Sequence, residues 1–231
     1  MIKENYCLAN AMFCIRGKTM QLEQKKLLLY VITNREYLRG KSLPDAIEQT
    51  LKGGATMVRF REKDRSLPSL MDDAKAIQKL CKAYQVPFIV DDDIAMALNM
   101  DADGVHLGQD DMKPKHAILS LGPNKIVGSS VHNEEEAFLS ISSGAHYLDC
   151  GCLYSSISAV NNVLITKEKL EAVCKMANVP VIGNGGVNLS NVEELKDTGI
   201  CGISVARGVF DSDDVEAATR ALREKVESLW G

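Results

Sequence analysis

From residue 27 onward, short apolar segments alternate with longer amphipathic segments, and no other feature of the 231-residue chain constrains its fold as strongly. Short apolar runs indicate buried strands, whereas apolar residues spaced three and four apart indicate helices. We predict eight strands, at Leu27–Thr33, Thr56–Arg61, Pro87–Asp91, Gly104–Leu107, Lys125–Ser130, Tyr147–Gly151, Val179–Gly183 and Gly202–Ala206. We predict helices at Leu43–Lys52, Leu67–Tyr84, Ile94–Asn99, Lys113–Leu121, Glu134–Ser143, Lys167–Met176, Val192–Thr198 and Val215–Leu229.

This repetition predicts an α/β fold with parallel strands, because strands joined by helical crossovers run in the same direction. Eight strand–helix units within about 200 residues fit a single closed (β/α)8 TIM barrel, which we place at residues 27–231. An open, doubly wound sheet is the structural alternative. Residues 1–26 are assigned to an N-terminal extension outside the core, and the apolar stretch Tyr6–Ile15 also allows a weak signal-peptide interpretation.

Charge and cysteine usage limit the partners and the cellular compartment that we expect. With 27 Lys and Arg against 31 Asp and Glu, the net charge of −4 gives no reason to expect nucleic acid or an anionic membrane as partner. No apolar run reaches the length of a transmembrane helix. The seven cysteines include no Cys-x-x-Cys pair, which predicts reduced thiols in a cytoplasmic protein. Assembly into a homo-oligomer stays open.

A barrel enzyme carries its functional residues at the C-terminal ends of its strands and in the loops that follow. The second strand ends in three cations that alternate with apolar residues: Val58, Arg59, Phe60, Arg61 and Lys63. A period of two turns the cations toward the barrel mouth and the apolar pair toward the helices. The cations predict a pocket for a multiply charged anion. The alternative is a solvated basic edge paired with Glu62 and Asp64.

The third and fourth strands are followed by carboxylates: Asp91, Asp92 and Asp93, and then Asp110 and Asp111. So many like charges at one mouth are unfavourable unless cations neutralise them. Mg²⁺ suits the position, because it usually binds one or two carboxylates together with substrate phosphates. Asp93 and Asp110 have a second interpretation as helix N-caps.

Glycine-rich loops follow the last two strands, at Gly183–Gly186 and Ala206–Gly208. Loops at these places form the usual phosphate site of a barrel, where backbone N–H groups surround a dianion. Arg207 would add a charge-assisted contact. The phosphate site, the metal site and the cationic strand end together predict two phosphorylated ligands, one of them a metal-bound diphosphate.

These residues resemble the thiamine-phosphate synthase family over about Leu28 to Phe210. The segments that carry the resemblance are Tyr30–Thr33, Arg59–Lys63, Asp91–Asp92, Gly104–Asp111, Gly128–His132, Gly185–Gly186 and Gly202–Phe210, of which the Gly-Val-His-Leu-Gly-Gln run is the most specific. The resemblance implies a (β/α)8 barrel that joins hydroxymethylpyrimidine diphosphate to thiazole phosphate. The products are thiamine phosphate and diphosphate, and the implied cofactor is Mg²⁺.

The resemblance also implies roles for individual residues. Arg61 and Lys63 would hold the diphosphate, Asp92 and Asp111 would ligate Mg²⁺, and Ser130 would lie beside the pyrimidine substrate. The thiazole side would be contacted by Ser156 and Ser158, and the thiazole phosphate by Gly186, Ala206 and Arg207.

The chain departs from the family pattern at several of these positions. Arg59 stands in place of a glutamine, Asp91 in place of an asparagine, and Arg207 in place of a serine. We assign all three to substrate binding. Ala159 stands where the family has a lysine that contacts the diphosphate-bearing substrate, which removes one cation from the site. Arg59 offsets one of these charge changes.

Two other functions remain open. One is a thiazole tautomerase, related to the same family, with His132 as its acid and base because imidazole titrates near neutrality. A helix-capping or structural role is the alternative for His132. The other function is non-catalytic binding of a phosphorylated ligand, which the altered loop Ser156–Ala159 favours.

Overall fold

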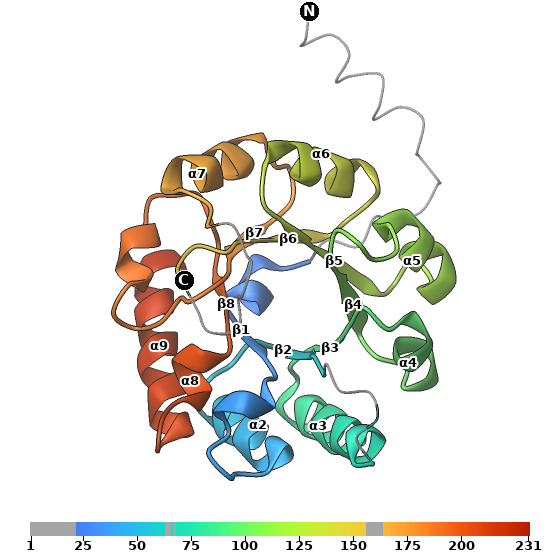
Figure 1. Cartoon of the computed structure of the whole chain (residues 1–231), viewed down its shortest axis with the longest axis vertical. Coiled ribbons are helices and arrows are strands. Elements are labelled where there is room, and N and C mark those ends of the chain that lie inside the picture. The colour runs from blue at the N-terminus through green and yellow to red at the C-terminus, as the bar shows by residue number, and fades with distance from the viewer. Residues whose placement is uncertain (1–21, 63–65, 67, 156–163) are drawn as a thin grey trace, which may run out of the picture.

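The computed structural model describes residues 22–62, 66, 68–155 and 164–231, and shows a closed barrel of parallel strands (Figure 1). Each strand pairs with its neighbour in sequence, and the eighth pairs with the first. The strands are β1 (Leu29–Ile32), β2 (Met57–Phe60), β3 (Phe88–Asp91), β4 (Gly104–Leu107), β5 (Ile126–Val131), β6 (Tyr147–Cys150), β7 (Val181–Gly183) and β8 (Ile203–Val205). The predicted barrel is confirmed, and the open-sheet alternative is wrong.

Helices surround the barrel (Figure 1). They are α2 (Leu43–Lys52), α3 (Leu70–Tyr84), α4 (Ile94–Asn99), α5 (Pro114–Leu121), α6 (Glu134–Ser142), α7 (Lys167–Met176), α8 (Arg207–Phe210) and α9 (Val215–Trp230), with 3-10 helices η1 (Gln24–Leu27), η2 (Arg35–Tyr37) and η3 (Val192–Leu195). The helix predicted after the seventh strand is only the short η3. The short α8 was not predicted, because its four residues are too few to show a helical period.

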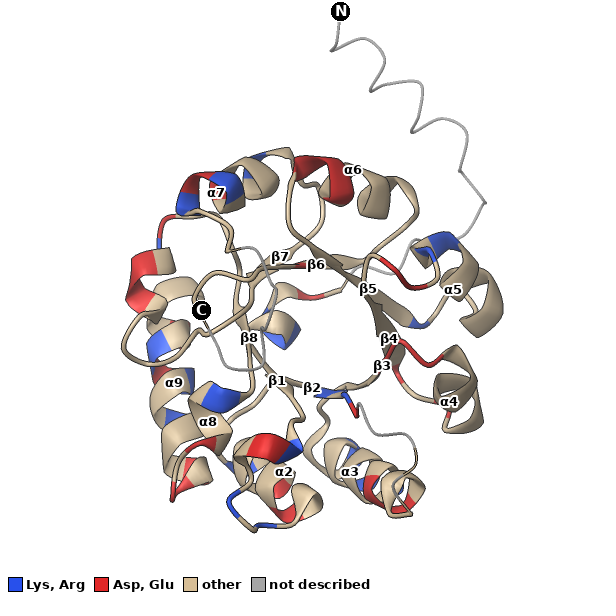
Figure 2. Cartoon of the chain, in the orientation of Figure 1, with Lys and Arg blue, Asp and Glu red and all other residues tan. Residues whose placement is uncertain are grey.

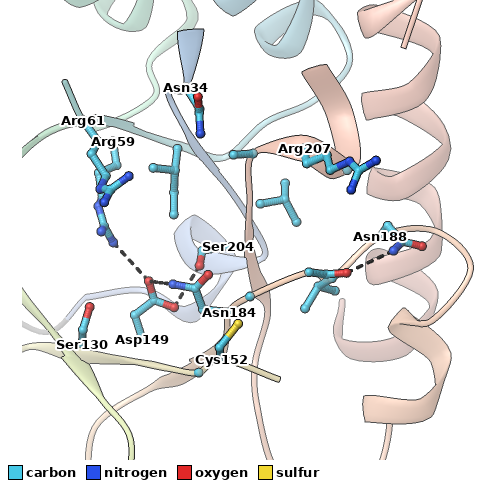
Figure 3. A pocket seen from close by; sticks show the side chains of 18 of the residues that line it. Asn34, Arg59, Arg61, Ser130, Asp149, Cys152, Asn184, Asn188, Ser204 and Arg207 are labelled. Carbon is cyan, nitrogen blue, oxygen red and sulfur yellow. Dashed lines mark hydrogen bonds and ion pairs between the residues drawn. The ribbon is translucent and has the colours of Figure 1, made fainter. Parts of the chain in front are cut away.

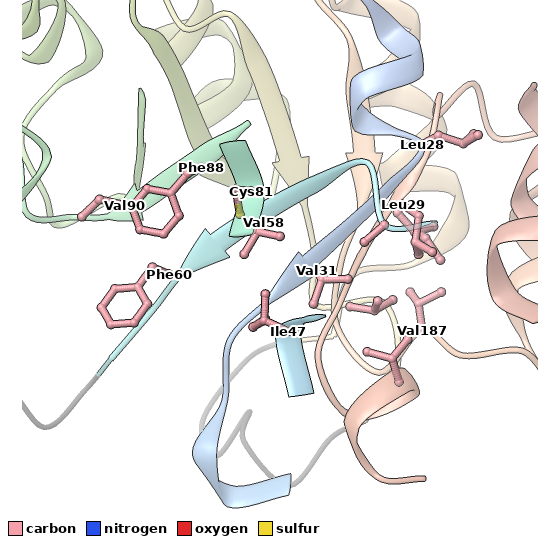
Figure 4. Packing of buried hydrophobic residues seen from close by; sticks show 14 of the residues in the cluster. Leu28, Leu29, Val31, Ile47, Val58, Phe60, Cys81, Phe88, Val90 and Val187 are labelled. Atoms are coloured by element: carbon pink, nitrogen blue, oxygen red, sulfur yellow. The ribbon is translucent and has the colours of Figure 1, made fainter. Parts of the chain in front are cut away.

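The core has two layers, which the alternation along β2 predicts. Val58 and Phe60 pack outward with the helices, near Phe88 (Figure 4). Met57 instead belongs to a cluster inside the barrel, together with Tyr30 and residues of other strands. Burying one such side chain contributes roughly 1.5–3 kcal/mol. The outward position of Val58 and Phe60 turns Arg59 inward, as the period of two requires.

The two proposed helix caps have different outcomes. Asp93 caps α4, and its Oδ1 accepts a hydrogen bond from the Met96 N–H at 2.8 Å. The cap interpretation of Asp110 is wrong, because Lys113 occupies the N-cap of α5 and Pro114 begins the helix. Asp110 is therefore an exposed residue of the β4–α5 loop.

The described part of the chain begins close to the proposed barrel boundary. Leu22 packs against the apolar cluster inside the barrel, and η1 ends in the buried Leu27. Residues 1–21 lie outside the described residues, so the division into an extension at 1–26 and a barrel at 27–231 stays a prediction. None of the helices in the described ranges is long and apolar enough to cross a membrane.

Candidate active site

A cavity of about 620 Å³ opens at the C-terminal ends of β1, β2 and β5 to β8 (Figure 3). This is the end of the barrel at which functional residues are expected. Six of the predicted site residues line it: Arg59, Arg61, Ser130, Gly186, Ala206 and Arg207. Side chains far apart in the sequence therefore meet at one opening.

Arg59 lies buried between two carboxylates. Its Nε is 2.5 Å from Asp91 Oδ1, and its Nη1 is 3.2 Å from Asp149 Oδ2. Burial alone would lower the pKa of Arg59, but Asp91 and Asp149 outweigh this effect and raise it. Arg59 and Asp91, two of the three substitutions assigned to substrate binding, thus neutralise each other.

Arg61 directly follows β2 and lines the cavity with part of its side chain exposed. Its Nε lies 3.3 Å from Asp91 Oδ2, and its side chain is 34% exposed. The backbone is fixed by Thr33, whose Oγ1 accepts the Arg61 N–H and donates to the Arg61 carbonyl, both at 2.8 Å. The end of β2 is therefore held against β1 while the guanidinium reaches the opening.

Asp149 is a site residue that we did not predict. Its carboxylate is 1% exposed and accepts hydrogen bonds from Arg59 Nη1, from Asn184 Nδ2 at 3.0 Å and from Ser204 Oγ at 2.9 Å (Figure 3). Burial raises the pKa of Asp149 to about 6, because it outweighs the lowering by Arg59 and the two hydrogen bonds. The signal in the sequence was a carboxylate inside an otherwise apolar strand.

Replacing Asp149 by Asn should change how stability depends on pH. A carboxyl whose pKa rises on folding, from about 3.9 in the unfolded chain, binds its proton more tightly when folded. Its stabilising contribution is present below about pH 4 and is lost as pH rises through about 6. We expect the stability of Asp149→Asn relative to the wild type to rise across this window. Urea unfolding at several pH values measures the difference in stability between the variant and the wild type, with Asp110→Asn as an exposed control. A difference that does not change with pH would contradict the raised pKa of Asp149.

The glycine-rich loops lie on the β7 and β8 side of the cavity. Gly185 and Gly186 have φ angles of 88° and 67°, which favour glycine. A Cβ on Gly186 would also lie 2.8 Å from the Cβ of Tyr154. The loop presents backbone to the cavity at close range, as a phosphate-binding loop requires. Arg207 also lines the cavity, and its Nε is 3.1 Å from Asp211 Oδ2.

Asp92 and Asp111 follow the neighbouring strands β3 and β4 and are not among the residues that line the cavity. Figure 2 shows acidic residues near the ends of these strands, next to the basic end of β2. Asp111 Oδ2 accepts the Gly108 N–H at 2.7 Å, which orients the carboxylate. Within the described ranges, no group of three or more His, Cys, Asp or Glu is arranged so that it could hold a metal ion by itself. Carboxylate oxygens are the type of donor that Mg²⁺ takes, and its binding by Asp92 and Asp111 stays a prediction.

The contacts of His132 are those expected for a helix-capping or structural histidine. Glu136 Oε2 lies 2.7 Å from His132 Nδ1 and accepts the His132 N–H at 2.8 Å, at the start of α6. The residue also lines the cavity. Four predicted positions, Lys63, Ser156, Ser158 and Ala159, lie outside the described residues, so their roles remain predictions.

Comparisons with known proteins agree on one family. The family model described as thiamine monophosphate synthase matches residues 29–209. Thiamine-phosphate synthase from Persephonella marina is 37% identical over 90% of this chain and 100% of its own length. The enzyme of that name from Clostridium acetobutylicum is 35% identical over 86% of this chain and 94% of its own length.

Solved structures show the same relation. Thiamine phosphate pyrophosphorylase from Pyrococcus furiosus superposes with a TM-score of 0.80 at 36% identity, covering 90% of this chain and 99% of its own. A structure of KGPDC from Streptococcus mutans, with a TM-score of 0.63 and 15% identity, shares only the fold; it covers 89% of this chain and 100% of its own.

Proposed function

Because the chain belongs to the thiamine monophosphate synthase family, we propose that it is a thiamine-phosphate synthase that condenses hydroxymethylpyrimidine diphosphate with thiazole phosphate in the presence of Mg²⁺. A transferase of this type needs one site for a diphosphate and another for a monophosphate. The observation that carries the proposal is a single cavity with Arg61 on one wall and the glycine-rich loops on another.

The reaction is a substitution at the pyrimidine methylene carbon. The bond from this carbon to the diphosphate oxygen breaks, and a bond from the thiazole nitrogen to the same carbon forms. When bound, Mg²⁺ supplies charge stabilisation to the leaving diphosphate. Asp92 and Asp111 are the residues that would hold it, and Arg61 would contact the diphosphate.

The other residues position the second substrate. The backbone of Gly185 and Gly186, with Ala206 and Arg207, would hold the thiazole phosphate. The chemistry then depends on orientation and electrostatic stabilisation, and requires no protein nucleophile.

The contact between Arg59 and Asp91 supports activity despite the altered sequence. An added carboxylate beside the diphosphate would oppose its binding. The buried Arg59 guanidinium, 2.5 Å from Asp91, offsets this charge. The two substitutions together leave the local charge unchanged.

The test is an assay that mixes both substrates with and without Mg²⁺ and measures thiamine phosphate and diphosphate. We expect equal amounts of the two products, dependent on Mg²⁺. Isomerisation of the thiazole without diphosphate release, lost in His132→Gln, would instead identify a tautomerase. Binding of thiazole phosphate with neither reaction would identify a non-catalytic protein.

The proposal includes a cytoplasmic location. All five cysteines in the described ranges are free thiols: Cys81, Cys150, Cys152, Cys174 and Cys201. Unpaired thiols are typical of a reducing compartment.

A further inference from the structure

Four polar side chains form a continuous hydrogen-bonded chain through the barrel interior. Tyr30 Oη lies 2.9 Å from Tyr147 Oη, which lies 2.9 Å from His106 Nδ1. His106 Nε2 lies 2.8 Å from Ser130 Oγ. Both tyrosines are fully buried and His106 is 1% exposed, whereas Ser130 lines the cavity. This series of hydrogen bonds therefore runs from the core to the candidate active site.

The inner end of this chain determines where each proton lies. Among the residues that the structure describes, Tyr147 is the hydrogen-bond partner of Tyr30 Oη. A buried O–H left without an acceptor is costly, so the Tyr30 hydroxyl donates to Tyr147. The Tyr147 hydroxyl then donates to His106 Nδ1.

A neutral His106 that accepts at Nδ1 must carry its proton on Nε2. The ring is neutral because an imidazolium carries a proton on both nitrogens and could not accept the Tyr147 hydroxyl proton at Nδ1. Nε2 therefore donates to Ser130 Oγ. The reverse order would leave the Tyr30 hydroxyl without an acceptor.

The backbone of Ser130 is held in place as well. Its carbonyl accepts a hydrogen bond from Gln109 Nε2 at 2.6 Å, and its backbone belongs to β5. With the hydroxyl oxygen already accepting from His106, the Ser130 proton points to a partner other than the histidine. The cavity is the open side.

We propose that Tyr147 and His106 are positioning residues that make Ser130 Oγ a hydrogen-bond donor into the cavity, so that the ligand must present an acceptor atom there. The identity of that ligand rests on the proposed function: for the pyrimidine substrate the partner of the Ser130 proton is an acceptor such as a ring nitrogen. Tyr30 fixes the direction of the chain from its inner end.

The first test requires no ligand. ¹⁵N NMR of the ligand-free full chain, with the His106 signals assigned by their loss in His106→Gln, distinguishes the two nitrogens. We expect Nε2 to be protonated and Nδ1 to be an unprotonated acceptor. A proton on Nδ1, or on both nitrogens, would overturn the proposal even if the chain is an active synthase.

The second test is kinetic. We expect Ser130→Ala to raise the KM for hydroxymethylpyrimidine diphosphate about tenfold. If Tyr147 acts through Ser130, Tyr147→Phe raises the same KM, and adding it to Ser130→Ala produces no further rise. Additive effects on KM would contradict this.

Thr219→Val is the control, because it removes a buried hydroxyl on α9 that donates to the Val215 carbonyl. We expect it to leave this KM unchanged. Should wild-type protein form no thiamine phosphate, the proposed function fails, and the NMR result still decides the proton order.

Discussion

Arg59→Gln is expected to lower the free energy of unfolding by about 3–5 kcal/mol, the typical effect of breaking a buried ion pair from one side. Asp149 is fully buried and Asp91 has a side chain 15% exposed. The variant removes the buried guanidinium that contacts both carboxylates. Guanidinium unfolding at pH 7 measures the loss.

Arg61→Gln is the matched control for that variant. It makes the same chemical change two residues further along the chain, directly after β2, but Arg61 is a third exposed and its one described ion pair is 3.3 Å long. An exposed pair of this kind contributes about 0–1 kcal/mol. Equal stability losses in the two variants would show that Arg59 is not a buried counterion. Adding Asp91→Asn to Arg59→Gln should recover part of the loss, because it removes one of the two carboxylates that lose the buried cation.

Asp111→Asn is expected to reduce kcat/KM for the pyrimidine substrate by about 10²–10³-fold, since a bound metal ion contributes several kcal/mol of charge stabilisation. The change keeps the shape of the side chain and an oxygen for the Gly108 N–H, but removes the charge. The measurement is product formation over a range of Mg²⁺ concentrations. The Mg²⁺ concentration needed for half-maximal rate should also rise.

Asp110→Asn is the control for this prediction. It removes the same charge from the adjacent, exposed position in the β4–α5 loop. We expect activity close to that of the wild type. A similar loss in both variants would indicate a general effect of loop charge and would remove the reason to place Mg²⁺ at Asp111.

Much of the candidate site could be predicted because barrel topology is regular. Once the strands were identified, their C-terminal ends had to converge. Arg61, Ser130, Gly186 and Arg207 accordingly line one cavity. Asp92 and Asp111 follow adjacent strands, as expected, although they do not line that cavity.

The partners of buried polar groups could not be predicted in the same way. Arg59 and Asp91 are two separate departures from the family pattern in the sequence, and only their contact shows that they compensate. Asp149 lies 90 positions from Arg59, and no local pattern links them. The chain from Tyr30 to Ser130 also joins four different strands.

The sequence by itself determined the barrel, its strand order and the end that carries the site, because periodic apolar residues and short crossovers are local properties of the chain. Only the tertiary structure decided which charges are neutralised inside the barrel, and which hydroxyl proton faces the cavity. These outcomes depend on distances between side chains of different strands and on their removal from water, and both arise only when the barrel closes.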